Sequence, residues 1–298
     1  MKAHIHLLAI LLFFSSLRAL EPVADNTDLV IFSYDRPMQL YALLESVEEY
    51  VTGLASVSVI YRTSNEDFAQ GYDQVQARFD NVVYFKQGAN PRADFKPLVL
   101  KAAFESLHDY ILFAVDDDIV KDYVDLNECI ACMHKHKAYA FYLRLGMNLT
   151  ECYSMGSAQR VPQLVQVEHG VYAWRFCDGQ HDWGYPNNVD LTLYRKRDIV
   201  QNLQSLSYYS PNGLEGIWAN GYHSIAHKHG LCYECTKIVN LPLNRVQNEC
   251  QNVHMNFMTP LELLEKFNQQ KKIDIKLLYK IQNKAAHMAY EPVFTDRG

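Results

Sequence analysis

The stretch Tyr110-Ile-Leu-Phe-Ala-Val-Asp-Asp-Asp-Ile-Val120 places three adjacent carboxylates directly after six residues that are typical of a buried strand. Adjacent acids repel one another, and each of them resists leaving water. A cluster of this kind at the end of a buried strand therefore needs a partner that offsets its charge. The sequence on either side indicates where in the fold this strand end lies.

Strand and helix patterns alternate through residues 28–120. Four short apolar runs have the character of strands: 28–33, 57–61, 82–85 and 110–115. Between these runs, apolar residues recur at helical spacing after Pro37, after Ser64 and after Pro97. The alternation predicts an α/β fold with a mostly parallel, Rossmann-like central sheet flanked by helices. Ligands of such sheets bind beyond the carboxyl ends of the strands, which is where the three acids fall.

The second half is less regular and is predicted to complete one domain over residues 21–258. Strand patterns occur at 138–145 and 237–241, and 161–176 alternates enough for two strands around His169-Gly170. Residues 175–188 predict a long loop, and long loops on sheet proteins are often functional.

A helical tail is expected over residues 259–298. Thr259-Pro-Leu-Glu262 is a capping box with proline at the first helical position. Ile275, Leu278 and Ile281 predict a second helix after it.

The N-terminus has the pattern of a secretory signal. Lys2 precedes the apolar run 7–14, and small or polar residues follow it. This run is too short to span a bilayer comfortably. We expect residues 1–20 to be a signal peptide or a short membrane anchor. The protein would then enter the secretory pathway and be exported or anchored, and a cytoplasmic location is the alternative.

Composition limits the classes of partner and metal. The net charge is −6 with a pI near 6.0, which argues against a nucleic-acid binder. Seven cysteines include the pairs Cys129/Cys132 and Cys232/Cys235, which allow either a zinc site or a mixture of buried thiols and disulfides. The clustered acids instead suggest Mg²⁺ or Mn²⁺, which bind carboxylate oxygens and could hold a diphosphate. In an extended chain, Asp116 and Asp118 would point the same way and reach one ion.

Two motifs resemble glycosyltransferases of the GT-A fold, within the nucleotide-diphospho-sugar transferases and similar to family 2. They are Phe32-Ser-Tyr-Asp-Arg-Pro37 and Val115-Asp-Asp-Asp118, and the clear match covers roughly residues 28–120. The resemblance implies a nucleotide pocket formed by Ser33, Tyr34, Asp35 (where the family usually has Asn), Arg36, Asp116 and Asp117. It further implies that Asp118 is the direct metal ligand, that Asp116 contacts ribose or metal-bound water, and that a late histidine, His254 ranked first, completes the metal shell.

Further residues have a functional and a structural interpretation. Lys96 could meet the nucleotide or be a surface lysine. Trp183 and Tyr185, beside Asp182, could stack on an acceptor sugar, or Trp183 could pin the loop. Glu215 matches the family's catalytic base, with Asp182 as the second candidate and a helix-cap role as the alternative.

These features predict a metal-dependent glycosyltransferase that moves a sugar from a nucleotide-diphosphate donor to a hydroxyl of a glycan, lipid or protein acceptor. A nucleotidyltransferase is one alternative, although its usual glycine-rich loop is missing between Ser33 and Pro37. A non-catalytic carbohydrate- or calcium-binding protein is the other.

Overall fold

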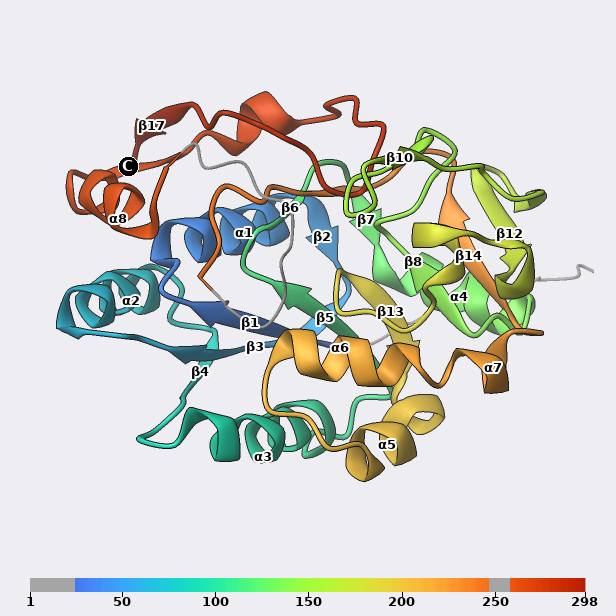
Figure 1. Cartoon of the computed structure of the whole chain (residues 1–298), viewed down its shortest axis with the longest axis horizontal. Coiled ribbons are helices and arrows are strands. Elements are labelled where there is room, and N and C mark those ends of the chain that lie inside the picture. Colours follow the sequence, from blue (N-terminus) through green and yellow to red (C-terminus); the bar gives the residue numbers. More distant parts are fainter. Residues whose placement is uncertain (1–24, 247–257, 298) are drawn as a thin grey trace, which may run out of the picture.

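The central feature of the computed structural model, which describes residues 25–246 and 258–297, is a nine-stranded sheet with helices on both faces (Figure 1). From edge to edge the strands are β11 (Val165–Glu168), β12 (Val171–Arg175), β14 (His229–Tyr233), β8 (Ala140–Tyr142), β13 (Thr192–Arg195), β5 (Tyr110–Val115), β1 (Thr27–Tyr34), β3 (Leu54–Arg62) and β4 (Val83–Lys86). β12 and β13 run against the other seven strands. The predicted α/β fold with a mostly parallel sheet is confirmed.

Eight α-helices and three 3₁₀ turns are found in the described residues. They are α1 (Pro37–Tyr50), α2 (Glu66–Arg78), α3 (Pro91–Phe104), α4 (Leu126–Lys135), α5 (Lys196–Ser205), α6 (Pro211–Ala219), α7 (Tyr222–Ile225), α8 (Pro260–Asn268), η1 (Phe176–Asp178), η2 (His181–Gly184) and η3 (Ile275–Leu278). Four strand pairs lie outside the large sheet: β2 (Val51–Thr52) with β7 (Val124–Asp125), β6 (Asp118–Val120) with β15 (Ile238–Asn240), β9 (Glu151–Cys152) with β10 (Ser157–Ala158), and β16 (Lys271–Ile273) with β17 (Phe294–Asp296).

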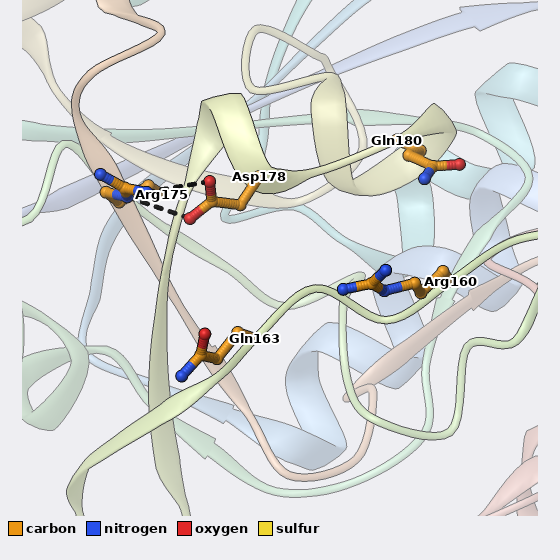
Figure 2. Close-up of a pocket in the computed structure, with 5 residues that line it drawn as sticks. All are labelled: Arg160, Gln163, Arg175, Asp178 and Gln180. Atoms are coloured by element: carbon orange, nitrogen blue, oxygen red, sulfur yellow. Dashed lines mark hydrogen bonds and ion pairs between the residues drawn. The ribbon is translucent and has the colours of Figure 1, made fainter.

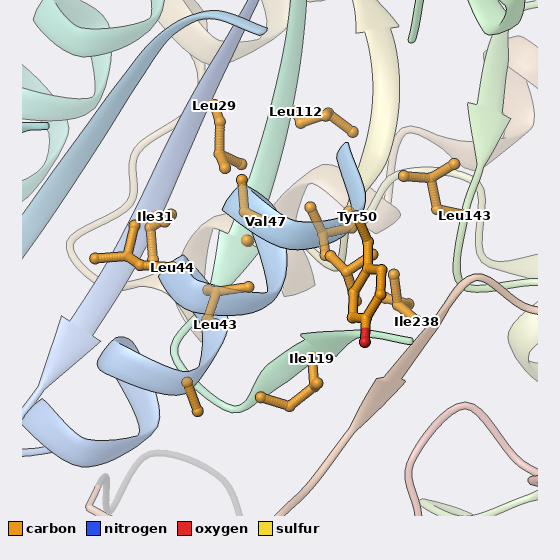
Figure 3. Close-up of a cluster of buried hydrophobic side chains, with 14 of the residues drawn as sticks. Leu29, Ile31, Leu43, Leu44, Val47, Tyr50, Leu112, Ile119, Leu143 and Ile238 are labelled. Carbon is orange, nitrogen blue, oxygen red and sulfur yellow. The ribbon is translucent and has the colours of Figure 1, made fainter. Parts of the chain in front are cut away.

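The first core covers the face of the sheet on which α1 lies. Figure 3 shows Leu29 and Ile31 of β1 directed toward Leu43, Leu44 and Val47 of α1, and all five are buried. α2 and α8 lie on the same side of the sheet (Figure 1).

The second core covers the opposite face, which is formed by the alternate residues of the same strands. Val30 and Phe32 of β1 face α3, where the rings of Phe32 and Phe95 are 5.2 Å apart between centroids. Since β1 is covered on both faces, it is apolar at every central position instead of alternating with polar residues.

Helix α3 starts six residues before the predicted position. The side chain of Asn90 accepts a hydrogen bond from Ala93 N, and Pro91 occupies the first turn, so Pro97 falls inside the helix. A capping side chain followed by proline is a stronger start signal than a proline alone.

The C-terminal tail is helical only at its beginning. The predicted capping box is present at the start of α8, with Thr259 and Glu262 bonding each other's backbone amides. The second predicted helix is only the single turn η3, because Ile275 and Leu278 are buried at the i, i+3 spacing that one turn satisfies.

The N-terminal signal or anchor predicted over 1–20 lies outside the described residues. None of the helices in 25–246 and 258–297 has the length and apolar character that a membrane-crossing segment requires. The six cysteines in these ranges are free thiols, and Cys129 bonds the Tyr233 hydroxyl at 3.2 Å, so the alternative of a four-cysteine zinc site finds no support there.

The second residue of strand β1 is a buried acid, Asp28, whose side chain is 1% exposed. Its carboxylate accepts hydrogen bonds from Lys196 Nζ at 2.5 Å, from Ser56 Oγ at 2.5 Å and from Ser106 Oγ, and His108 Nδ1 lies 2.7 Å away. Burial acts to raise the pKa of Asp28, but these partners, Lys196 first, outweigh burial and hold the pKa below its ordinary value. The network ties β1 to β3 and α5.

We expect Asp28→Asn to lower the free energy of unfolding by about 3 kcal/mol at pH 7, because Lys196 would lose its buried counter-charge. The folded-state pKa of Asp28 lies below its unfolded value of about 3.9. Its stabilisation is therefore present above that value and is lost as the pH falls through the folded pKa. Urea unfolding of the wild type and of Asp28→Asn at pH 7 and pH 3 measures the difference in their free energies of unfolding. The matched control is Glu48→Gln, which breaks an exposed pair with Arg78 and should cost under about 0.5 kcal/mol. An equal cost of Asp28→Asn at both pH values would contradict the account.

Candidate active site

A cavity of about 560 Å³ opens at the carboxyl ends of β1, β3 and β5. One side of it is formed by these strand ends and the start of α3. The other side is formed by the β9–β10 hairpin, the 181–190 loop and the start of α6. Among its lining residues are Ser33, Tyr34, Arg36, Arg62, Arg92, Asp116, Asp117, Arg144, Tyr153, Asp182, Tyr185, Asp190, Tyr209, Glu215, Asn240, Asn244 and His287.

Asp116 is the first of the three acids and is almost fully buried at the cavity wall. One carboxylate oxygen accepts from Arg36 Nη1 at 2.9 Å, and the other accepts from Ser33 Oγ at 2.8 Å and Tyr34 N at 3.1 Å. Burial raises the pKa of Asp116 to about 6, although Arg36 opposes the shift. The strand end and the turn after β1 are thus joined through this carboxylate.

The charge of the acid cluster is offset by Arg36. Its Nη1 donates to Asp116 and also to Asp117, at 2.9 and 3.0 Å, and its Nε donates to Asn244 Oδ1 at 2.9 Å. Burial acts to lower the pKa of Arg36, but the two carboxylates outweigh burial and raise that pKa above its ordinary value. The sequence therefore provides its own counter-ion to Asp116 and Asp117, three residues after Ser33.

Asp118 lies away from the cavity. Residues 116 and 117 form a turn, so the expectation that the chain stays extended through the acids is wrong. Asp118 starts β6 and is 0% exposed, and its oxygens accept from Val115 N at 3.2 Å and Asn240 Nδ2 at 3.1 Å. Burial, and then the charges of Asp190 and Asp117, raise the pKa of Asp118. The structure presents Asp117, instead of Asp118, to the cavity.

The residues predicted to bind the nucleotide are only partly brought together. Ser33, Tyr34 and Arg36 line the cavity, and the Arg62 guanidinium lies 3.7 Å from the centroid of the Tyr34 ring. Asp35 does not line it; with a φ of 52° it holds the turn after β1, where its carboxylate accepts from Ser64 N at 2.8 Å.

Lys96 also lies away from the cavity. Its amine donates to the carbonyls of Gln204 and Leu206 at 2.7 and 2.6 Å. It therefore joins α3 to the end of α5, in agreement with its structural interpretation.

Only some of the residues predicted to contact an acceptor line the cavity. Asp182 and Tyr185 line the cavity. Trp183 is 0% exposed, its carbonyl accepts from Trp174 Nε1 at 3.0 Å, and the two indoles are 5.1 Å apart. Trp183 therefore anchors the loop to the core and does not line the cavity in which an acceptor would bind.

Glu215 lines the cavity from the second turn of α6, a helix capped by Ser210. Its Oε1 accepts from Val189 N at 3.3 Å. Burial, and then the charge of Asp190, raise the pKa of Glu215 to about 8. A carboxylate that titrates near neutral pH is suited to take up a proton from a hydroxyl.

Asp190 and His287 also line the cavity, although the sequence analysis did not select them. His287 reaches the site because the C-terminal segment runs beside Asn240: Asn240 N donates to Ala286 O at 3.0 Å, and Met288 N donates to Asn240 O at 2.9 Å. No local motif marks this pairing. The histidine ranked first, His254, lies outside the described residues.

A second, smaller pocket of about 270 Å³ is lined by Arg160, Gln163, Arg175, Asp178 and Gln180 (Figure 2). Arg175 and Asp178 pair there through two bonds of 3.0 Å. This pocket contains a single acid, whereas the large cavity gathers several carboxylates.

We expect Glu215→Gln to stabilise the protein at pH 8 to 9, by about 2 kcal/mol, and to have little effect near pH 4. The folded-state pKa of Glu215 lies above its unfolded value, so its favourable contribution is complete below the unfolded value and is lost as the pH rises toward about 8. Glutamine keeps the shape without the charge. Thermal unfolding midpoints across this pH range measure the effect, and a variant that is less stable than the wild type at pH 9 would contradict it.

The chain was compared with known protein families, curated proteins and solved structures. No family matches. The bifunctional glycosyltransferase pgtA of Dictyostelium discoideum is 26% identical over 198 residues, which cover 61% of this chain and 25% of pgtA. The chain thus spans about a quarter of the length of this curated relative.

Solved structures with a similar fold include TarS and GalNAc-T7. TarS 1-349 of S. aureus in complex with UDP-GlcNAc is 12% identical, with coverage of 78% of this chain and 61% of that chain and a TM-score of 0.47. GalNAc-T7 with UDP, GalNAc and Mn²⁺ is 14% identical, with coverage of 81% and 47% and a TM-score of 0.46. The sequence similarity to pgtA, together with the sheet described above, confirms the predicted resemblance of this chain to glycosyltransferases of the GT-A fold.

Proposed function

We propose that the protein is a metal-dependent glycosyltransferase that moves a sugar from a nucleotide diphosphate to an acceptor hydroxyl. One observation carries the proposal: a single cavity brings together groups suited to a diphosphate and a group suited to removing a proton. Arg36, Arg62 and Arg92 line it near the carboxyl ends of the parallel strands, and Asp182 and Glu215 line it from the 181–190 loop and α6. The arginines suit a diphosphate, and a carboxylate suits removal of a proton from a hydroxyl.

The carboxylates at the end of β5 fit a divalent cation that is shared with a substrate. Asp116 and Asp117 offer hard oxygen ligands at the cavity wall. The described residues form no group of three or more His, Cys, Asp or Glu side chains that could hold an ion, so its remaining ligands would have to come from phosphates and water. When bound, Mg²⁺ or Mn²⁺ would offset the charge of the departing diphosphate.

The chain's own residues would orient the donor around this point. The Tyr34 ring, backed by the Arg62 guanidinium, offers a flat surface to a base, and Arg92 lies 3.9 Å from the centroid of the Tyr209 ring at the same cavity. Arg36 bonds both acids and Asn244, so it would act on a phosphate beside them through its charge.

Glu215 is the better candidate for the base. Its carboxylate has one backbone donor, Val189 N, and lines the cavity. Both oxygens of Asp182 are engaged, by Arg144 at 3.2 Å and by Gln159 at 3.0 Å. Tyr185 and Tyr153 flank this region and suit a sugar ring in a glycan, lipid-linked or protein-linked acceptor.

Calorimetry with UDP and GDP, in Mn²⁺ and in EDTA, tests the donor half of the proposal. We expect Asp117→Asn to weaken Mn²⁺-dependent nucleotide binding by at least about tenfold, because it removes a hard ligand at the cavity wall. Asp178→Asn, which changes a paired surface acid outside the cavity, is the matched control and should leave binding unchanged. Equal nucleotide affinity in Mn²⁺ and EDTA for the wild type would overturn the metal-dependent part.

A donor-hydrolysis screen across nucleotide sugars tests the catalytic half. Glu215→Gln should keep nucleotide affinity within about twofold and reduce turnover by about 10² to 10⁴-fold, because the base is lost. Normal turnover of this variant would show that another group is the base. A wild type that binds nucleotide sugars but releases no sugar with water or with any acceptor would instead support the non-catalytic alternative.

A further inference from the structure

Arg144 is a buried cation on the acceptor side of the cavity, with a side chain that is 3% exposed. It lies just beyond β8 and holds the 181–190 loop at two points. Its Nη1 donates to Asp182 Oδ1 at 3.2 Å, and its Nη2 donates to the carbonyls of Asp182 and Tyr185 at 3.1 and 3.4 Å. Two of the cavity-lining residues of that loop, Asp182 and Tyr185, are therefore fixed by one guanidinium.

The same guanidinium is close to the two other carboxylates of this side. β8 and β13 pair antiparallel with Tyr142 opposite Thr192, and Leu143 N donates to Leu191 O at 3.4 Å. Leu143 and Arg144 form a turn directly after β8, and the charge of Arg144 is the largest effect that opposes the rise in the pKa of Asp190. Glu215 is held near Asp190, because its Oε1 accepts from the N–H of Val189, the residue before Asp190.

Four charged groups thus lie together at the cavity: the buried Arg144 and the partly buried Asp182, Asp190 and Glu215. Burial acts to lower the pKa of Arg144, but Asp182, Asp190 and Glu215 outweigh burial and raise it, in that order. In return, Arg144 opposes the rise in the pKa of Glu215 that burial, Asp190 and Asp182 produce. Asp190 is also faced by His287 and Asp117, so its own charge depends on neighbours across the cavity.

We propose that Arg144 is a positioning residue for the transfer reaction: it anchors the acceptor loop and supplies the positive charge that lets Glu215 act as a base beside two other acids. This inference rests on the proposed function for its catalytic meaning. Without this cation, three carboxylates would face one another in a buried space, and ionisation of the base would cost more.

The test is the pH profile of donor hydrolysis in Mn²⁺, with the nucleotide sugar that the wild type hydrolyses fastest. A base must be deprotonated, so the rate rises with pH through the pKa of Glu215. Arg144→Gln should move the midpoint of this rise in the alkaline direction by about one pH unit. Arg144→Lys, which keeps the charge but not the fork of hydrogen bonds, should keep the midpoint and lower the maximal rate. An unmoved midpoint in Arg144→Gln would overturn the proposal.

Asp182→Asn provides an independent variant if Arg144→Gln does not fold. It removes one of the two acids that raise the pKa of Glu215, and leaves the bonds from Arg144 to the two carbonyls in place. The midpoint should move in the acid direction, opposite to that of Arg144→Gln. A midpoint that does not move, or complete loss of turnover, would show that Asp182 does not act through this charge cluster.

The matched control is Arg195→Gln. Arg195 is also a buried arginine, but it donates to the carbonyls of Ala138 and Met133 and pairs with Asp198 outside the cavity. Its loss should lower the thermal midpoint and leave the pH profile where it was. If the midpoint of the pH profile also moved in the alkaline direction in Arg195→Gln, the movement would follow from general destabilisation of the fold. That result would overturn the proposal.

A second measurement separates this inference from the proposed function. The stability gap between wild type and Arg144→Gln should widen as the pH rises from 6 to 9, because ionising the buried acids then costs more, whereas the gap for Arg195→Gln should stay constant. This readout needs no turnover. If the wild type hydrolyses no nucleotide sugar, the proposed function fails, and the stability gap still decides whether Arg144 supports the charge of these acids.

Discussion

The guanidinium of Arg36 between the carboxylates of Asp116 and Asp117 is the contact on which the rest of the site depends. Two buried acids next to each other are unfavourable without a positive charge, and this arginine supplies it from the turn after β1. The same side chain also bonds Asn244, so one residue joins the first strand, the end of the fifth strand and the segment after β15. The cavity exists because these three segments meet there.

Much of this arrangement was predictable from the sequence, because the parallel half of the sheet follows local rules. Apolar runs of strand length and helical spacing identified β1, β3, β4 and β5, and a parallel sheet brings the carboxyl ends of such strands to one edge. Ser33, Tyr34, Arg36, Asp116 and Asp117 follow directly from that rule. The helix start at Pro91 was missed because the cap at Asn90 is a short polar signal near a second proline.

The rest depends on pairings between distant segments, which have no local signature. Asp118 is hidden because β6 pairs with β15, some 120 residues later in the chain, and His287 is at the cavity because the tail runs beside Asn240. Arg144 reaches the 181–190 loop, which also carries Asp190, because β8 pairs with β13. Trp183 is fully buried against Trp174, and the amine of Lys96 bonds two backbone carbonyls, so neither side chain lines the cavity. Residue type alone could not distinguish the side chains that line the cavity from those that are used within the fold.

The position of His287 has a consequence for how the protein could be divided. A boundary near residue 258 separates the sheet from the tail along the chain, but His287, which lines the cavity, comes from beyond that boundary. A fragment that ended there would retain every strand of the large sheet and would still lack part of the pocket surface. For experiments that shorten, fuse or exchange parts of this protein, the smallest unit to keep intact includes the tail.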